Sequence, residues 1–157
     1  MEITVISVGK INSSWIQEGI QLFESRIKRY IKYSPIIIPD IRNSKSLSKE
    51  TIKEEEGKLI MENLASSDIV VIMDEKGKEF TSRDFSEWIQ KQMVGGRKRL
   101  VLVIGGPYGF SKAVADKADY KISLSKMTFT HEMAKLILTE QIYRAMTILR
   151  GEPYHHD

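Results

Sequence analysis

Two glycines end an apolar run in the stretch VLVIGGPYGFS, residues 101–111, and a proline and a third glycine follow them. Glycine has no side chain, so it lets another group come close to the backbone and accepts positive φ angles. A phosphate, a dinucleotide, a small cofactor or another segment of the same chain could occupy such a loop. A turn that only needs positive backbone angles explains the glycines equally well.

The spacing of these glycines excludes the two common phosphate-binding motifs. Neither the Walker pattern G-x-x-x-x-G-K-[ST] nor the dinucleotide pattern G-x-G-x-x-G occurs around GGPYG. The next expected strand ends in ISLSKM, so it also lacks the acidic residue that holds a ribose in dinucleotide-binding folds. The loop therefore predicts close approach to the backbone without a bound pyrophosphate.

A second group of polar residues lies toward the C-terminal end. His131 begins the last expected helix, where the helix dipole favours a neutral imidazole. Arg144 lies further along that helix, and the chain ends in PYHHD. Adjacent tail histidines have no fixed ligand geometry and no Ser-His-Asp elbow is present, so we expect neither a metal site nor a hydrolase. A single histidine at the start of a helix is more often a capping or packing residue than a catalytic one.

Short β-branched runs alternate with helical patterns along the chain, and these elements must position the polar groups. Five strands are expected, at ITVISV, PIIIPDI, DIVVIMD, RLVLVIGG and DYKISLS. Five helices are expected to begin near Ser14, Ser48, Thr81, Ser111 and Thr130, the last one running to Arg150. This alternation predicts an α/β fold with a mostly parallel sheet and helices on both faces. The prolines of PIIIPDI favour a sheet edge or the end of a strand.

Ligands of such sheets bind at the carboxyl ends of the strands. Three of these ends are rich in glycine or polar residues, namely IMDEKGK, IGGPYG and SLSKMTF. We therefore expect the functional site where these three segments meet.

The composition restricts the class of protein. A chain of 157 residues with 41% hydrophobic and 29% charged residues predicts a single globular domain over residues 1–157. No apolar run approaches the roughly 20 residues that span a bilayer, and the start MEITVISVGK lacks the features of a secretory signal. The absence of cysteine excludes disulfides and thiolate chemistry. We expect a cytoplasmic protein that does not contact a membrane.

The net charge of +3 permits an acidic partner such as nucleic acid but does not require one. Bases alternate with aromatic residues in RIKRYIKY, residues 26–33, and a second basic stretch, RKR, occupies residues 97–99. Both stretches are also typical of solvated helix faces and charged turns.

The last expected helix predicts a partner. Eleven of the seventeen residues from Met133 to Leu149 are apolar or tyrosine. A helix that rests on one sheet needs an apolar stripe only about 100° wide. These residues cover two faces, so the helix needs a second surface, and a second copy of the chain is the most economical one. We therefore expect a homodimer.

Four segments together resemble one family of enzymes. They are VISVGK, VVIMDEKGKEF with TSRDF, LVIGGPYGFS, and SLSKMTFTHEMAKLILTEQIYRAMTILRGEPYHH. These segments and their order along the chain are similar to those of the ribosomal RNA large-subunit methyltransferase H family of the SPOUT methyltransferases. The resemblance covers essentially the whole chain. The segment LSKMTF before His131, together with the terminal PYHH, is the most specific part of the resemblance.

The resemblance implies a deep trefoil knot at the C-terminal end of the α/β sheet, an exception to the rule against knots. The three strand-end segments would be the knot loops and would hold S-adenosyl-L-methionine in a bent shape. The cofactor-binding residues, transferred by position, are Met73, Gly105, Leu124, Ser125, Lys126, Met127, Thr128 and Phe129. Without the resemblance, Ser125 and Thr128 would be interpreted as turn residues and Met127 as a core residue.

The resemblance also implies the reaction, which is methylation of N3 of a pseudouridine in large-subunit (23S) ribosomal RNA on the assembled ribosome. The enzyme must then hold the methyl group in line and stabilise a developing imide anion, and no metal is required. The residues expected to do this are His131, Arg144, Tyr154 and His155. The basic stretches at residues 26–32 and 97–99 are expected to serve the active site of a partner subunit.

One position departs from the family pattern. Thr130 stands where similar proteins carry proline, and because threonine can cap the helix itself, we expect little effect. His156 and Asp157 are assigned no role. Two other functions stay open, a nucleotide-binding α/β protein without methyl transfer and a non-enzymatic dimeric RNA-binding module.

Overall fold

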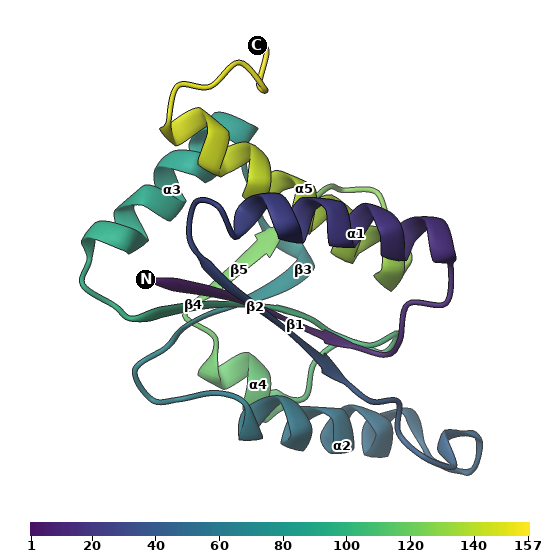
Figure 1. Ribbon diagram of the computed structural model, residues 1–157. Helices are drawn as coiled ribbons and strands as arrows, with labels where there is room; N and C mark the ends of the chain where they lie inside the picture. The colour runs from purple at the N-terminus through teal and green to yellow at the C-terminus, as the bar shows by residue number, and fades with distance from the viewer.

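The computed structural model describes all 157 residues and contains one five-stranded sheet between two layers of helices (Figure 1). The strands are β1 (Glu2–Val8), β2 (Lys32–Ile38), β3 (Ile69–Glu79), β4 (Arg99–Ile104) and β5 (Tyr120–Ser123). The helices are α1 (Ser14–Ile27), α2 (Lys49–Glu62), α3 (Ser82–Val94), α4 (Lys112–Lys117) and α5 (His131–Leu149), with a short 3₁₀ helix, η1 (Ser44–Ser46), before α2. The expected alternation is confirmed, and every strand pairing is parallel.

The strands lie in the order β2-β1-β4-β3-β5. The central strands β1 and β4 are buried over almost their whole length, as parallel strands covered on both faces must be. β2 lies at an edge, as its prolines predicted. It begins earlier than expected and carries Pro35 inside the strand, which an edge strand tolerates because a missing N–H can face away from the neighbouring strand. The trefoil knot stays a prediction of the resemblance.

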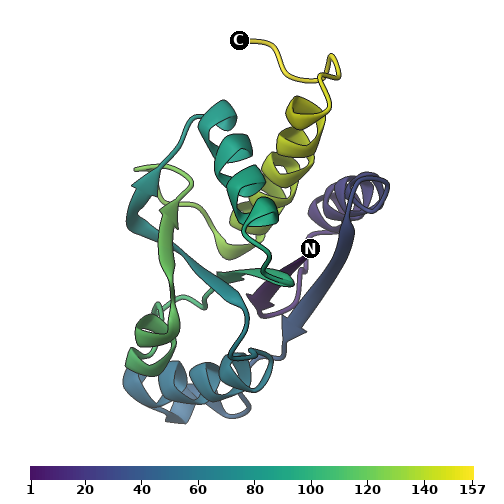
Figure 2. The same cartoon turned by 90° about the vertical axis from the view of Figure 1, so that its left-hand side faces the viewer.

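Helices α1, α3 and α5 cover one face of the sheet, and α2 and α4 cover the other (Figures 1 and 2). Sixteen buried residues form the larger core under the first three helices, and nine form the core under α2 and α4. α5 packs against both α1 and α3. The chain itself therefore covers two flanks of the helix for which a second surface was expected.

Side-chain caps fix where four of the helices begin. The hydroxyls of Ser48, Thr81, Ser111 and Thr130 each accept a hydrogen bond from the amide three residues later. Thr130 accepts from the amide of Met133 at 3.2 Å, so the cap expected at this position is confirmed. α1 begins without such a cap.

Because all strands are parallel, their carboxyl ends share one edge of the sheet, here called the carboxyl edge, and their amino ends share the opposite amino edge. The two basic stretches lie at or near the amino edge, where several of their members are already engaged. Arg99 pairs with Asp68, with Nη2 2.5 Å from Oδ2, and Lys32 pairs with Glu2 at 2.9 Å. These contacts make Arg99 and Lys32 part of the framework of the fold.

Candidate functional site

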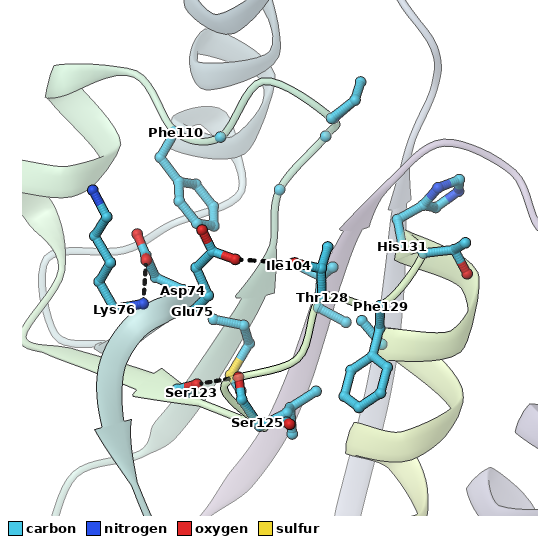
Figure 3. Close-up of a pocket in the computed structure, with 18 of the residues that line it drawn as sticks. Asp74, Glu75, Lys76, Ile104, Phe110, Ser123, Ser125, Thr128, Phe129 and His131 are labelled. Atoms are coloured by element: carbon cyan, nitrogen blue, oxygen red, sulfur yellow. Dashed lines mark hydrogen bonds between the residues drawn. The ribbon is translucent and has the colours of Figure 1, made fainter.

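A pocket of about 890 Å³ lies at the carboxyl edge, between the segments that follow β3, β4 and β5 (Figure 3). The first amino acids of α5 complete its wall. The pocket is lined by Met73–Lys76, Ile104–Phe110, Ser123–Ser125, Met127–His131 and Ala134. The three strand ends that the sequence singled out therefore meet around one cavity.

The glycine loop is shaped by two close contacts. A Cβ on Gly105 would lie 3.0 Å from the ring of Phe110, and a Cβ on Gly106 would lie 2.3 Å from Oε2 of Glu56 on α2. Glu56 is only 5% exposed, and its Oε1 has no hydrogen-bond partner. Burial, and then the charge of Asp40, raise the pKa of this carboxyl. The glycines thus allow a buried carboxyl and an aromatic ring to lie directly against the loop.

The segment after β5 is held in its turn by its own side chains. Ser123 Oγ donates to the carbonyl of Ser125 at 2.9 Å, and Ser125 Oγ accepts from the amide of Met127 at 3.0 Å. Thr128 donates to Glu75, which follows Met73 and Asp74 on β3, at 3.3 Å. Ser125 and Thr128 are therefore turn residues, and both also line the pocket; their role in cofactor binding stays a prediction. Met127 is 77% exposed, which makes its interpretation as a core residue wrong.

His131 lies where α5 enters the pocket wall. Its Nε2 is buried without a hydrogen-bond partner, and a Cβ on Gly9 would lie 3.5 Å from it. The next residue, Glu132, accepts hydrogen bonds from the amides of Asn12 and Ser13. These bonds join the segment after β1 to the start of α5 and hold His131 at the carboxyl edge.

Arg144, Tyr154 and His155 form a second cluster at the other end of α5, where the tail folds back on the helix. Glu140 joins them, because its Oε1 accepts from Arg144 Nη2 at 2.6 Å and from the Tyr154 hydroxyl at 2.9 Å. Arg144 Nη1 also lies 3.2 Å from His155 Nδ1. The guanidinium of Arg144 stacks over the Tyr154 ring at 4.7 Å. Burial and the hydrogen bond to Glu140 raise the pKa of Tyr154.

The last residue adds an ion pair with α3. Asp157 accepts from Arg83 Nε at 2.7 Å and lies 3.1 Å from His155 Nε2. The hydrogen bond with Arg83 is the main cause that lowers the pKa of Asp157. Asp157, which received no role from the sequence, therefore anchors the tail that carries Tyr154 and His155.

The pocket and the C-terminal cluster lie at opposite ends of the longest helix (Figure 1). Arg144 follows His131 by thirteen residues on α5. At about 1.5 Å of rise per residue, their Cα atoms are about 20 Å apart. One chain therefore does not bring Arg144, Tyr154 and His155 to the pocket that His131 lines.

The structure groups the predicted residues as follows. Of the expected cofactor-binding residues, those that line the pocket are Met73, Gly105, Leu124, Ser125, Met127, Thr128 and Phe129. Lys126 is exposed and does not line it. The sequence reasoning missed Glu140 and Glu56. The i, i+4 spacing from Arg144 could have indicated Glu140, whereas nothing in the sequence places Glu56 against Gly106.

None of the helices is both long and apolar enough to cross a bilayer. No three histidine, aspartate or glutamate side chains are grouped as the ligands of a metal ion would be.

The contact between Gly106 and Glu56 can be tested through stability. We expect Gly106→Ala to lower the free energy of unfolding by about 1–3 kcal/mol, because the new methyl group must displace a buried carboxyl. Urea denaturation measures this. Gly95→Ala is the matched control, since a Cβ there meets atoms no closer than 3.5 Å. In a Glu56→Ala background Gly106→Ala should cost less, and an equal cost in both backgrounds would contradict the contact.

Comparison with known proteins agrees with this geometry. A family model described as "Predicted SPOUT methyltransferase" matches residues 1–155. A protein of Parabacteroides distasonis named ribosomal RNA large subunit methyltransferase H is 53% identical, with all of both chains covered. Proteins of the same name from Christiangramia forsetii and Flavobacterium johnsoniae are 51% and 50% identical, each over 99% of both chains. The chain belongs to the ribosomal RNA large-subunit methyltransferase H family of the SPOUT methyltransferases.

Proposed function

We propose that the protein methylates N3 of a pseudouridine in large-subunit ribosomal RNA, on the assembled ribosome, with S-adenosylmethionine as the methyl donor. One observation carries the proposal. The strand ends expected to bind the donor meet around a single pocket, and seven of the eight residues transferred by position line it. The family membership and the printed names of the relatives support the ribosomal RNA substrate.

The pocket residues fit an adenosyl group. The volume of about 890 Å³ lies within the range of small-molecule sites. Met73, Leu124 and Phe129 supply apolar walls for a purine, and Gly105 leaves the backbone open to polar atoms of the ligand. We propose that these residues hold the donor and that the surrounding loops are those of a trefoil knot.

When bound, S-adenosylmethionine supplies a methyl group on a positive sulfur, which keeps the electron pair of the broken carbon–sulfur bond. N3 of the uracil ring must lose its proton as it forms the new bond to carbon. The chain therefore needs a fixed cation and hydrogen-bond donors near the imide, and a group that takes the proton. Arg144 is the fixed cation, with Tyr154 and His155 beside it. The Tyr154 hydroxyl donates to Glu140 and its ring lies against the guanidinium, so Tyr154 holds Arg144 and Glu140 in place.

This assignment requires a homodimer. The pocket and Arg144 are about 20 Å apart along α5, so a complete site needs the pocket of one chain and the tail of another. Trp15 is 62% exposed and Leu22 is 47% exposed. These two residues are seven positions apart on α1 and so share one face of that helix. We propose that this face and the adjoining side of α5 pack against the second copy.

Transfer of a tritiated methyl group to purified large subunits or whole ribosomes tests the proposed function. We expect incorporation only into ribosomes that carry the target pseudouridine, and none when the pseudouridine synthase that makes it is absent, because uridine, whose N1 is bonded to the ribose, lacks the free N1–H that pseudouridine presents. Equal incorporation into both preparations would contradict the substrate assignment. The matched preparations differ in that one modification alone.

Calorimetry separates the rival functions. Binding of S-adenosylhomocysteine, the demethylated product, supports methyl transfer. Binding of a nicotinamide dinucleotide in its place would favour a nucleotide-binding protein without methyl transfer. Binding of neither compound would favour a non-enzymatic RNA-binding module.

A further inference from the structure

We propose that four cations on one side of the pocket, Lys10, Arg42, Lys45 and Lys49, form a track that binds the phosphate backbone of the RNA substrate. This inference rests on the proposed function and names the surface through which the RNA would reach the pocket. The four residues are here called the basic track. All four are exposed, and they lie in the segments that follow β1 and β2 or, for Lys49, at the first position of α2.

Two contacts place the ends of the basic track beside the pocket. Lys10 follows Gly9, whose Cβ position would be 3.5 Å from Nε2 of the pocket residue His131. The ammonium of Lys49 lies 5.5 Å from the ring centroid of Tyr108, which also lines the pocket.

Between these ends, the segment after β2 carries the other two cations. Arg42 lines a groove of about 500 Å³ between this segment and α2, together with Leu47 and Thr51. Lys45 lies in the 3₁₀ helix η1, within the same segment. The four cations therefore lie on the segments that follow β1 and β2 and at the start of α2, on the β1–β2 side of the pocket.

The cations of the basic track are free to bind a partner. None of the four makes an ion pair with a carboxylate of the chain. The segment from Pro39 to Lys49 contains three cations and a single carboxylate, that of Asp40. The neighbouring Glu50 forms an ion pair with Lys53, with Oε1 2.7 Å from Nζ. An excess of unpaired positive charge remains, which is what phosphate groups bind.

The basic stretches that the sequence suggested are less suited to this role. Arg99 and Lys32 are ion-paired, and Arg26 lies over the Tyr143 ring at 5.4 Å. Arg97 donates to the carbonyl of Ser67 at 3.3 Å. The strands that begin at Lys32 and Arg99 place these residues a strand's length away from the pocket of the same chain. The basic track is both unpaired and adjacent to the pocket.

Tyr108 gives the basic track a further contact with RNA. Tyr108 lines the pocket and is 42% exposed. Aromatic rings stack on unpaired bases, and a base must leave its helix before its imide edge can enter a pocket. Phosphate binding by the basic track and stacking on Tyr108 would together present an unpaired nucleotide to the site.

The test is a triple variant, Lys10→Gln, Arg42→Gln and Lys45→Gln, that leaves Lys49 and its contact with Tyr108 in place. Each phosphate that the variant no longer neutralises should reduce the slope of log affinity against log salt by about 0.7–0.9. We therefore expect the slope for binding of a protein-free ribosomal RNA fragment to fall by about 2–3. The KM for ribosomes should rise by about tenfold or more at physiological salt. The kcat at saturating ribosomes and the affinity for S-adenosylhomocysteine should stay at wild-type values, because none of the three residues lines the pocket.

The matched control replaces Lys58, Lys91 and Lys121 with glutamine, which removes the same charge from exposed positions outside the basic track and outside the two basic stretches. It should leave the salt slope and the KM close to wild type. An unchanged slope in the basic-track variant, or a slope changed equally by the control, would overturn the inference. So would a raised KM on ribosomes with unchanged binding of protein-free RNA, since the basic track would then dock on an acidic protein. Failure of the unsubstituted protein to methylate ribosomes would instead overturn the proposed function.

Discussion

Arg144→Ala is expected to lower kcat by about 100-fold to 1000-fold while the affinity for S-adenosylhomocysteine stays unchanged. A fixed cation aimed at a developing anion stabilises the transition state more than the ground state. Removal of one such donor typically lowers kcat by about 100-fold to 1000-fold. Arg144 is held in place by Glu140 at 2.6 Å and by the ring of Tyr154. Single-turnover methyl transfer and calorimetry with the product measure the two quantities separately.

Two companion variants make this result specific. His155→Ala should also lower kcat more than product affinity, because His155 contacts Arg144 at 3.2 Å. Arg150→Ala is the control, since Arg150 is an exposed arginine at the end of the same helix whose contact is the ring of Tyr30. It should retain wild-type kcat. If Arg144→Ala and Arg150→Ala behave alike, Arg144 is not part of the active site.

Mixing two inactive variants should restore activity. Phe129→Asp removes an apolar wall of the pocket at a position that is 37% exposed and so tolerates polar residues. Arg144→Ala removes the cation of the C-terminal cluster that Arg144 forms with Tyr154 and His155. If each site combines the pocket of one chain with the tail of another, a dimer of the two variants has one intact site. Random exchange of subunits would then give about a quarter of wild-type activity, because half of the dimers are mixed and each has one working site of two.

The control for this experiment is a mixture of Arg144→Ala with His155→Ala, which are both variants of the C-terminal cluster. In a mixed dimer of these two variants, both pockets are intact but both C-terminal clusters are altered. No site is restored, so the activity should stay at the level of the single variants. A mixture of the pocket and tail variants that also stays inactive after proven subunit exchange would contradict the composite site. Calorimetry on Phe129→Asp alone should first establish that product binding is abolished.

The layout of the fold could be predicted from the sequence, because each element carries its own local signal. Short β-branched apolar runs indicated the five strands, and hydroxyl caps such as Ser48 and Thr81 indicated where helices begin. The edge position of β2 followed from the backbone chemistry of proline. The meeting of three strand ends at one pocket followed from the rule that parallel strands share a carboxyl edge.

The parts that could not be predicted depend on contacts between residues far apart in the chain. The burial of Glu56 against Gly106 joins α2 to a loop fifty residues later, and no local pattern signals it. The placement of Lys126 outside the pocket depends on the turn that Ser123 and Ser125 form. The basic stretch around Arg99 suggested nucleic acid because its charges are visible in the sequence, whereas its partner Asp68 lies in another segment.

The order of the segments around the pocket has a consequence for synthesis of the protein. The first two walls come from β3, β4 and the residues that follow β4, but the third comes from residues 123–131 and the start of α5. A nascent chain that has not yet released its C-terminal segments from the ribosome lacks this wall and the bonds from Glu132 that tie it down. A ligand of the pocket can therefore stabilise only a chain whose residues 123–134 have emerged and folded, because the first two walls alone do not form the pocket.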